Sequence, residues 1–563
     1  MTFSNLPYKR PDIDALIANA HTIETKLVQE DNSEKIINII KTFFKLQDDI
    51  DMMAELANIR YSLNTSDDFY EAERNFFDEQ GPNVTEAIQK VIHTILKLDQ
   101  REALETHFGA LFFNKYEQQI KTFHPSIKDD LVKENKLITE YSKLIASARI
   151  DFDGKTLNLS KMAPYMQSLD RNIRHQAQLA VSQFLESKEA ALDDIYDQLV
   201  KVRHQIARQL GYQNFIQLGY DRLGRLDYTL KDVEVYRKQI EQDVVPYVQS
   251  LVKRQQKRLK LDSIKSYDMG IKFLSGSAKP KGNKDDLLKA ASKMYQAMDP
   301  SIHQFFEFML DHELLDLDAR ENKESGGYAT LIPNYGYPFI FANFNGTAHD
   351  VDVLTHEAGH ALQMYLSKDL IPEYRHPTLE AAEIHSMSME FFAWPWMEDF
   401  FKEDTQKYYF QHLAGSVSFL PYGALIDHFQ HEVYGHPDMS KEERKQIFHQ
   451  LEKRYMPHTD YDDDNFLNRG TYWYRQIHVF SDPFYYIDYT LAQVVAFYFW
   501  HAFREDKERA LKTYLSVCKV GGSLTFSDIL KHHGLPLPFQ ENMIASLMKP
   551  LQLYLDSIDD QNL

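Results

Sequence analysis

The sequence predicts a mainly α-helical protein with a minor β element. Over most of the chain, apolar residues recur three and four positions apart, beginning with Ile13, Leu16 and Ile17, and this period is typical of amphipathic helices. Long segments around 85–145 and 180–260 have charged residues on one helical face and aliphatic or aromatic residues on the other. We therefore expect helices to form the framework of the fold.

Strand-like segments are few. The segment FDGKTLNLS (152–160) suggests a small hairpin, and FIFANFNG (339–346), bounded by Pro338 and Gly346, is the best strand candidate. No repeat of fixed period is present, which argues against a solenoid.

Chain length and composition indicate a large protein of more than one lobe. The 563 residues are 43% hydrophobic, which is enough apolar side chain for a sizeable core. Between about residues 150 and 190 the sequence changes from charged helical segments to a turn-rich piece and back to helices. We place a boundary there, between an N-terminal part (1–185) and a C-terminal part (186–563).

Charge and cysteine content restrict the partners and the environment. The 63 basic and 83 acidic residues give a net charge of −20, which disfavours nucleic acid or an anionic membrane as the main partner. Cys518 is the only cysteine, so an intrachain disulfide and a thiolate metal cluster are excluded. The N-terminus lacks the apolar stretch of a secretory signal, and the apolar stretch 494–503 is about half as long as a membrane span. We expect a cytoplasmic, soluble protein.

The candidate metal site begins with HEAGH at residues 356–360. Residues four apart lie one turn apart on the same helical face, so His356 and His360 can bind one ion together. Glu357 follows the first histidine and can reach a water molecule on the open side of that ion. A histidine pair with no metal role is the alternative, and a third ligand would decide between the two readings.

A catalytic zinc ion needs a third protein ligand beside two imidazoles. No third histidine follows at short range, whereas the segment TLEAAEIHSMSMEFF (378–392) places Glu380, Glu383 and Glu390 on or near one helical face. Glu380 lies where a carboxylate complements the helix dipole, and Glu383 lies among apolar neighbours, where an unpaired charge would be costly. Spacing alone favours Glu383 without excluding its neighbours. His385 points to another face, and we expect it to be structural.

The segments VDVLTHEAGHALQ and AAEIHSMSME together resemble the thimet-oligopeptidase family of zinc metallopeptidases, in its oligoendopeptidase F (Pz-peptidase) branch. In that family the third zinc ligand is the glutamate that opens an E-[IV]-x-S-x-x-x-E segment, which here is Glu383. Ser386 and Glu390 occupy the matching positions. The resemblance implies that Glu390 orients a ligand histidine, and we expect Asp352 and Ser386 to support the ligands as well.

The likeness covers residues 190–550 well and the N-terminal third loosely. The segment 326–357 is similar to the family's strand, loop and zinc helix, and IHVFSDPFYYIDYTLAQ (477–493) is similar to its segment with a catalytic histidine and tyrosines. The family fold implies two helical lobes around a deep channel, with a small β-sheet next to the zinc helix. It also implies that residues 1–185 form a lid over a catalytic domain, residues 186–563.

The implied reaction is the hydrolysis of internal bonds in short oligopeptides, with one Zn²⁺ per chain. Glu357 would take the proton of the attacking water and later pass it to the leaving amine. His478 and Tyr489 are our choices for stabilising the negative charge that develops on the substrate oxygen. Thimet-type members have glycines in this late segment, where this chain has the Pro-Phe-Tyr version of the oligoendopeptidase F branch. The resemblance therefore leaves the separate roles of Tyr485, Tyr486 and Tyr489 open.

We expect the substrate to be held through its backbone. The segment FIFANF offers a strand edge, so Ala342 and Asn343 are the expected backbone partners of an extended peptide. Gly326 and Gly327 would let a loop approach the substrate closely, although an ordinary turn explains them equally well. Backbone pairing predicts broad tolerance of substrate side chains.

Three other functions compete with this one. A dipeptidyl carboxypeptidase or carboxypeptidase would need a cation for the substrate's terminal carboxylate, and Arg475 is the only candidate we name. A non-catalytic peptide-binding protein with structural zinc would not need Glu357, and a metal-independent helical scaffold is the least supported reading. The sequence does not distinguish a monomer from a homo-oligomer.

Overall fold

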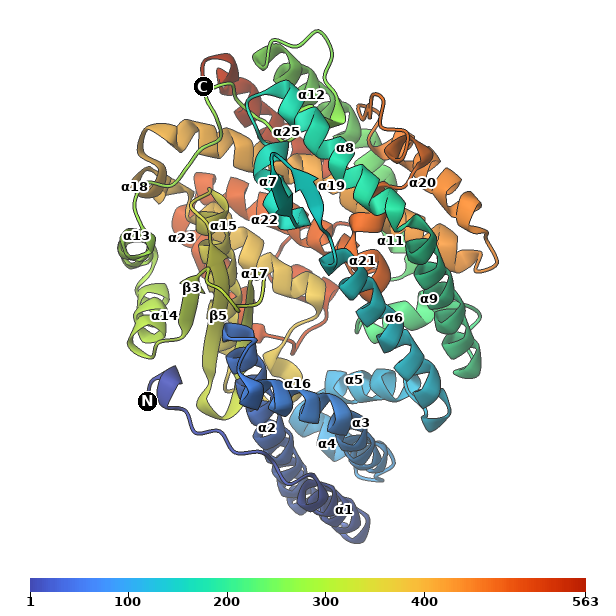
Figure 1. Ribbon diagram of the computed structural model, residues 1–563. Helices are drawn as coiled ribbons and strands as arrows, with labels where there is room; N and C mark the ends of the chain where they lie inside the picture. Colours follow the sequence, from blue (N-terminus) through green and yellow to red (C-terminus); the bar gives the residue numbers. More distant parts are fainter. The chain divides into compact units, whose positions relative to one another are not determined.

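The computed structural model describes residues 1–563 and confirms the mainly α-helical fold class (Figure 1). Its few strands form one two-stranded and one three-stranded sheet. The chain separates into two compact units, and each consists of three segments: unit 1 has residues 1–120, 279–405 and 498–535, and unit 2 has residues 121–278, 406–497 and 536–563. None of the helices combines the length and the hydrophobicity that crossing a membrane requires.

The sequence-based boundary near residue 185 falls inside unit 2, within helix α8 (Arg171–Ser187). The division into a lid (1–185) and a catalytic domain (186–563) remains a prediction.

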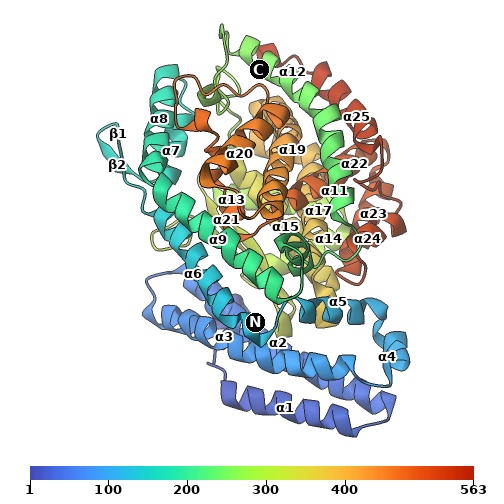
Figure 2. The same cartoon turned by 90° about the vertical axis from the view of Figure 1, so that its right-hand side faces the viewer.

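The first segment of unit 1 is a helical array. Helices α1, α2 and α3 pack against one another and are followed by two shorter helices (Figure 2). Asp12, Asn32 and Asp67 cap the first three helices, because each side chain accepts a hydrogen bond from a backbone N–H of the first turn. The bounds are α1 (Ile13–Gln29), α2 (Ser33–Leu63), α3 (Asp68–Leu96), α4 (Arg101–Phe108) and α5 (Ala110–Lys121).

The remaining segments of unit 1 place a small sheet beside two helices. The strand order is β3-β5-β4, with β3 parallel and β4 antiparallel to the central β5, and both β4 and β5 pack on α15. The elements are α13 (Lys284–Met298), α14 (Pro300–Asp311), β3 (Leu315–Asp318), β4 (Tyr328–Ile332), β5 (Tyr337–Phe344), α15 (His349–Ser367), α16 (Pro372–Arg375), α17 (Leu379–Phe392), α18 (Met397–Phe401), α23 (Lys507–Val520) and α24 (Phe526–His532). The expected small sheet beside the HEAGH helix is therefore present.

Unit 2 is helical apart from one hairpin. The hairpin β1 (Ile150–Phe152) and β2 (Lys155–Leu157) confirms the expectation for 152–160, because Asp153 and Gly154 both have positive φ, as a type I′ turn requires. Its helices include α6 (Lys128–Ala146), α8, α9 (Glu189–Gln209), α10 (Phe215–Arg222), α11 (Leu230–Gln239), α12 (Val245–Arg258), α20 (Lys441–Tyr455), α21 (Ile477–Ser481) and α25 (Met543–Ser557), with α7 (Leu159–Met166) after the hairpin. Two further helices, α19 (Thr405–Gly435) and α22 (Tyr486–Glu505), have residues in both units.

Candidate active site

The HEAGH motif lies in the middle of α15. The side chain of Asp350, in the first turn of this helix, accepts hydrogen bonds from the backbone N–H groups of Asn345 (2.9 Å) and Gly346 (2.7 Å), which fixes the turn between β5 and the helix. His356 and His360 then lie one turn apart on one face, with their ring centroids 5.0 Å apart. The helix therefore places both imidazoles where they can share an ion.

Helix α17 approaches α15 closely because of Gly359, the fourth residue of the motif. A Cβ atom at this position would lie 2.4 Å from the carbonyl oxygen of His385 and 2.7 Å from the Cα atom of Ser386. Only a residue without a side chain fits there. The close packing brings Glu383, from the next turn of α17, up to the two histidines.

Glu383 completes a group of three donors. Its Oε2 atom lies 3.4 Å from His356 Nε2 and 3.5 Å from His360 Nε2, and one donor atom from each residue lies within 4.8 Å of the others. Two ligands bound tetrahedrally to zinc at about 2.1 Å are themselves about 3.4 Å apart, so this separation fits a shared ion. Of the three glutamates that the sequence left open, Glu383 is the one that the fold places between the imidazoles.

Two further side chains hold these donors. Glu390 Oε1 lies 2.7 Å from Nδ1 of His356, which leaves the Nε2 atom of that ring for the shared site. Ser386 donates a hydrogen bond to Glu383 Oε2 at 2.9 Å. The roles expected of Glu390 and Ser386 as supports of metal ligands remain predictions. Asp352 lies one turn before His356 and accepts a hydrogen bond from Thr355 through its carbonyl oxygen, and its support of the ligands remains a prediction.

Burial and opposite charge compete in this cluster. Burial raises the pKa of Glu383, but the neighbouring His360 and His356 outweigh burial and hold that pKa well below its usual range. Burial likewise lowers the pKa of His356, and the contacts with Glu383 and Glu390 outweigh it and raise the pKa. The protein therefore supplies an anionic carboxylate at the point where the two imidazoles converge.

Glu357 is buried beside the donor group. Burial is the main reason why the pKa of Glu357 is raised, with His356 and His360 acting in the opposite direction. Its Oε2 atom makes no hydrogen bond with the protein. A buried carboxylate with a raised pKa is suited to accept and release a proton near neutral pH.

The glycine loop before β4 lies next to this carboxylate. A Cβ atom on Gly327 would be 3.6 Å from Glu357 Oε1, so the loop backbone borders the candidate site as expected. The amide of Asn343 holds the loop by donating to the carbonyl oxygens of Glu324 (2.8 Å) and Gly326 (2.9 Å). Gly326 itself has a φ of +97°, which favours glycine.

The prediction that FIFANF presents a strand edge is wrong. Strand β5 is the central strand: it is paired with β3 on one side and, over Tyr337–Phe341, with β4 on the other, so Ala342 and Asn343 lie beyond the pairing with β4. The carbonyl oxygen of Ala342 accepts a hydrogen bond from the buried ammonium of Lys323, and the Asn343 side chain is engaged with the loop. The edge strand nearest to Glu357 is β4, which follows Gly327 directly. The pattern of one strand could not reveal which neighbours pair with it.

The predicted histidine and tyrosines of the late segment form a second cluster, in unit 2. The ring centroid of His478 lies 5.7 Å from that of Tyr485, 5.0 Å from that of Tyr486 and 5.8 Å from that of Tyr489. The rings are partly exposed. The fold therefore brings all four predicted residues together, from α21, the turn after it and the start of α22.

A strained turn sets the position of the tyrosines. Phe484 has a φ of +70°, which a bulky side chain rarely adopts, and its ring is fully buried. Gln430 accepts from the Phe484 N–H at 3.1 Å, and Arg225 donates to the Phe484 carbonyl oxygen at 2.7 Å. Arg225 also pairs with buried Asp488 in the first turn of α22. These contacts hold the turn in its strained conformation and so fix the position of Tyr485, the next residue.

The chain matches two models of known protein families. Residues 164–549 match the model of Peptidase family M3, and residues 3–123 match the Peptidase M3 N-terminal domain. The chain belongs to peptidase family M3.

Two solved structures are similar to this M3 chain over nearly its whole length, and a further relative is similar over part of it. Pz peptidase A, solved with an inhibitor, is 44% identical, with a TM-score of 0.94 over 99% of this chain and 100% of that chain. A Bacillus anthracis protein provisionally described as an oligoendopeptidase F is 42% identical, with a TM-score of 0.90 over 100% and 99% of the two chains. An oligoendopeptidase F homolog from Borreliella burgdorferi is 23% identical over 437 residues, 72% of this chain and 71% of the relative.

Sequence reasoning missed two residues at the candidate site. Gly359 is the fourth residue of HEAGH, and a glycine inside a helix is a signal for close packing that was not used. Gln476 lies 2.8 Å from Nδ1 of His478 and was not singled out. Arg475, which the sequence did suggest as the cation for a terminal carboxylate, has its guanidinium 4.7 Å from the centre of the Tyr472 ring.

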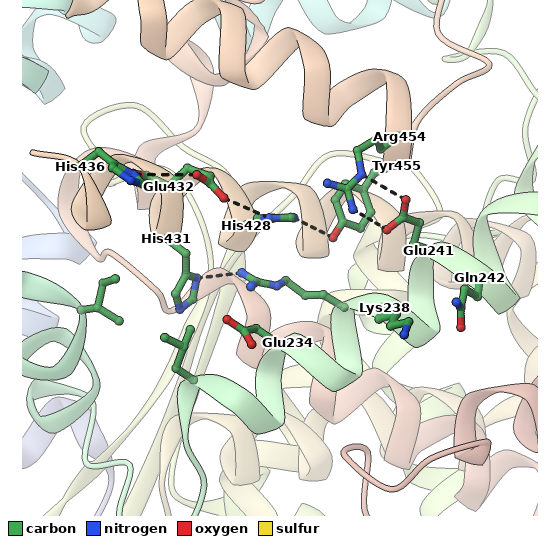
Figure 3. Close-up of a pocket in the computed structure, with 13 residues that line it drawn as sticks. Glu234, Lys238, Glu241, Gln242, His428, His431, Glu432, His436, Arg454 and Tyr455 are labelled. Carbon is green, nitrogen blue, oxygen red and sulfur yellow. Dashed lines mark hydrogen bonds and ion pairs between the residues drawn. The ribbon is translucent and has the colours of Figure 1, made fainter. Parts of the chain in front are cut away.

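Unit 2 of the M3 chain also contains a cavity of about 540 Å³ (Figure 3). Figure 3 shows Glu432 between His428 and His436, and Arg454 paired with Glu241. The lining includes three basic and three acidic side chains: Arg237, Lys238, Arg454, Glu234, Glu241 and Glu432. Because these charges balance, the cavity has no net preference for an anion or a cation. None of the residues predicted for metal, catalysis or substrate lines it.

Proposed function

We propose that this M3 chain is a zinc-dependent endopeptidase that hydrolyses internal bonds of short oligopeptides. The observation that carries the proposal is the triad of His356, His360 and Glu383, with the buried carboxylate of Glu357 beside it. Two imidazoles and one carboxylate leave a fourth tetrahedral position open, which is the pattern of catalytic rather than structural zinc. Membership of the M3 family and the likeness to Pz peptidase A support the same reading.

When bound, zinc supplies Lewis acidity, which lowers the pKa of a water molecule and polarises the scissile carbonyl. Glu390 orients the His356 ring, and Ser386 orients the Glu383 carboxylate. Glu357 accepts a proton from the attacking water and donates it to the amine of the leaving peptide. Its raised pKa suits both steps, because the carboxylate takes the proton in one and releases it in the other.

His478 and Tyr489 are proposed to donate hydrogen bonds to the oxygen on which negative charge develops, with Tyr485 and Tyr486 as the alternatives. One such donor contributes about 3 kcal/mol, or a factor of about 100 in rate. The grouping of His478 with the three tyrosines in unit 2 supports a shared role.

For substrate binding we propose the outer edge of β4. A peptide in extended conformation can add to this edge through backbone hydrogen bonds, and the strand begins directly after Gly327, which borders Glu357. Pairing of this kind reads the backbone and tolerates many side chains. We propose that the substrates are short peptides rather than folded proteins, and that the cytoplasm is the place of action.

Glu357→Gln tests the mechanism. The variant removes the proton acceptor and keeps the shape of the side chain, so it should retain one zinc ion per chain and bind peptides, with kcat reduced at least about 1,000-fold. Metal analysis, peptide binding by calorimetry and a quenched fluorescent peptide measure the three quantities. Turnover that survives the substitution would rule out this role for Glu357.

A peptide series separates endopeptidase from carboxypeptidase activity. Peptides of graded length, each with a free or an amidated C-terminus, are incubated with the enzyme and read by mass spectrometry. We expect internal cleavage of both forms. Loss of cleavage on amidation would instead favour a dipeptidyl carboxypeptidase or carboxypeptidase, which must bind the terminal carboxylate.

A further inference from the structure

Gln476 links Tyr422 to His478 through two hydrogen bonds. The Tyr422 hydroxyl donates to Gln476 Oε1 at 3.0 Å, and Gln476 Nε2 lies 2.8 Å from His478 Nδ1. All three residues belong to unit 2. An amide nitrogen has only hydrogens to offer, so His478 Nδ1 must be the acceptor in this contact.

The orientation of the amide is fixed by its other partner. Because the Tyr422 hydroxyl donates to Oε1, the Nε2 group of Gln476 faces the histidine.

Local backbone structure explains why Gln476 reaches His478. Gln476 is the residue that precedes α21, a position usually taken by a short polar residue that caps the helix. Its side chain makes no capping hydrogen bond and instead extends to the ring two residues further on. The Gln476 N–H is bonded to the Trp473 carbonyl oxygen at 2.9 Å, which holds the residue in place.

We propose that Gln476 is a positioning residue that holds His478 as the neutral tautomer with its proton on Nε2, and that Tyr422 sets the orientation of the Gln476 amide. A neutral imidazole that accepts at Nδ1 carries its proton on Nε2, and it then offers an N–H donor from that atom. The wrong tautomer would present a lone pair to a developing oxyanion and repel it. The kinetic part of this inference rests on the proposed function, whereas the tautomer itself does not.

The tautomer is measured on the zinc-loaded enzyme labelled with ¹⁵N-histidine. Nitrogen chemical shifts and two-bond couplings distinguish the tautomers, and the His478→Gln spectrum assigns the ring signals. We expect wild-type His478 to be protonated at Nε2 alone. Gln476→Glu should move a proton to Nδ1, because a carboxylate only accepts, and Gln476→Met should give a mixture of tautomers. Tyr422→Phe should also give a mixture of His478 tautomers, since the Gln476 amide can then rotate.

The kinetic test separates positioning from folding. Gln476→Glu should lower kcat about 100-fold, the usual effect of losing one oxyanion donor, with KM changed less than about threefold. The kcat of Gln476→Met should lie between those of the wild type and Gln476→Glu. Gln450→Glu, an exposed glutamine of α20, makes the same chemical change elsewhere in unit 2 and should leave both spectra and kinetics unchanged.

Two outcomes would overturn the proposal: a wild-type His478 ring protonated at Nδ1, or a ring signal that stays the same in both Gln476 variants. These results differ from a failure of the proposed function. If the enzyme neither binds zinc nor cleaves peptides, the function is wrong, while the spectra still report the tautomer. If cleavage needs Glu357 but the tautomer of His478 is the same in wild type and in the Gln476 variants, only the role of Gln476 is refuted.

Discussion

The carbonyl oxygen of His385 occupies the space that a side chain on Gly359 would need. A Cβ atom there would lie 2.4 Å from this oxygen, well inside the limit of ordinary contact. The pair sets the distance between α15 and α17, and with it the distance from Glu383 to the two histidines. The geometry of the candidate metal site therefore depends on a glycine that is not one of its donors.

Gly359→Ala should disrupt the donor group. Inside an exposed helix this change stabilises by up to about 1 kcal/mol, but here α17 must move away, which costs about 1–3 kcal/mol. We expect zinc content well below one ion per chain and a lower melting temperature, measured by metal analysis and calorimetry. Gly415→Ala in α19 meets no atom within 4 Å and should keep full zinc content and stability. Full zinc occupancy in Gly359→Ala would contradict the packing argument.

Glu390→Gln should weaken zinc binding without removing a ligand. The Glu390 carboxylate holds Nδ1 of His356 and makes that ring a stronger donor, and loss of such a contact typically reduces metal affinity about 10–100-fold. Competition with a chelator of known affinity measures the change. Glu398→Gln, an exposed glutamate of α18, serves as the control and should have no effect. Equal affinity in both variants would show that Glu390 does not orient the ligand.

Asn343→Ala should release the loop that carries Gly326 and Gly327. Two hydrogen bonds from the Asn343 amide are lost, each worth about 1 kcal/mol, so kcat/KM should fall about 10–30-fold while zinc content stays the same. Hydrogen exchange of residues 324–327 should become faster. Asn334→Ala removes a side chain that bonds to Asp49 instead and should leave this loop protected. A loop that exchanges at the wild-type rate in Asn343→Ala would refute the prediction.

Glu452 should make unit 2 less stable as pH rises. Burial, opposed by the hydrogen bond from Tyr461, raises the pKa of Glu452 from 4.5 to about 7. The folded protein therefore binds a proton more tightly than the unfolded chain, and the stability present below pH 4.5 is lost as pH rises through 7. A difference of 2.5 units corresponds to about 3 kcal/mol.

Glu452→Gln keeps the acceptor for Tyr461 and removes the charge. The variant should match wild type near pH 5 and be more stable by up to about 3 kcal/mol at pH 8, measured by urea unfolding. The exposed Glu140→Gln of α6 should leave the pH profile unchanged. If the wild-type and Glu452→Gln profiles are parallel from pH 5 to 8, Glu452 is already ionised at low pH in the folded state.

Some features could be predicted because they depend on neighbours in the sequence. The period of HEAGH places His356 and His360 on one face of any helix, and the Asp153-Gly154 pair forms the same tight turn wherever it occurs. The central place of β5 could not be predicted, since a strand's sequence shows which faces are buried but not which strands pair with its edges. The expectation that FIFANF lies at a sheet edge failed for this reason, and the pairing of Ala342 and Asn343 with substrate remains a prediction.

By itself the sequence determined the helical class, the two imidazoles one turn apart and the choice of acidic residues from which a third donor had to come. Only the tertiary structure placed Glu383 between the two imidazoles, brought Gln476 into contact with His478, and made β4 rather than β5 an edge strand. The physical reason is distance along the chain. Periodicity governs residues within a few turns of one helix, whereas contacts between separate elements depend on how closely their backbones pack, as Gly359 allows for α15 and α17.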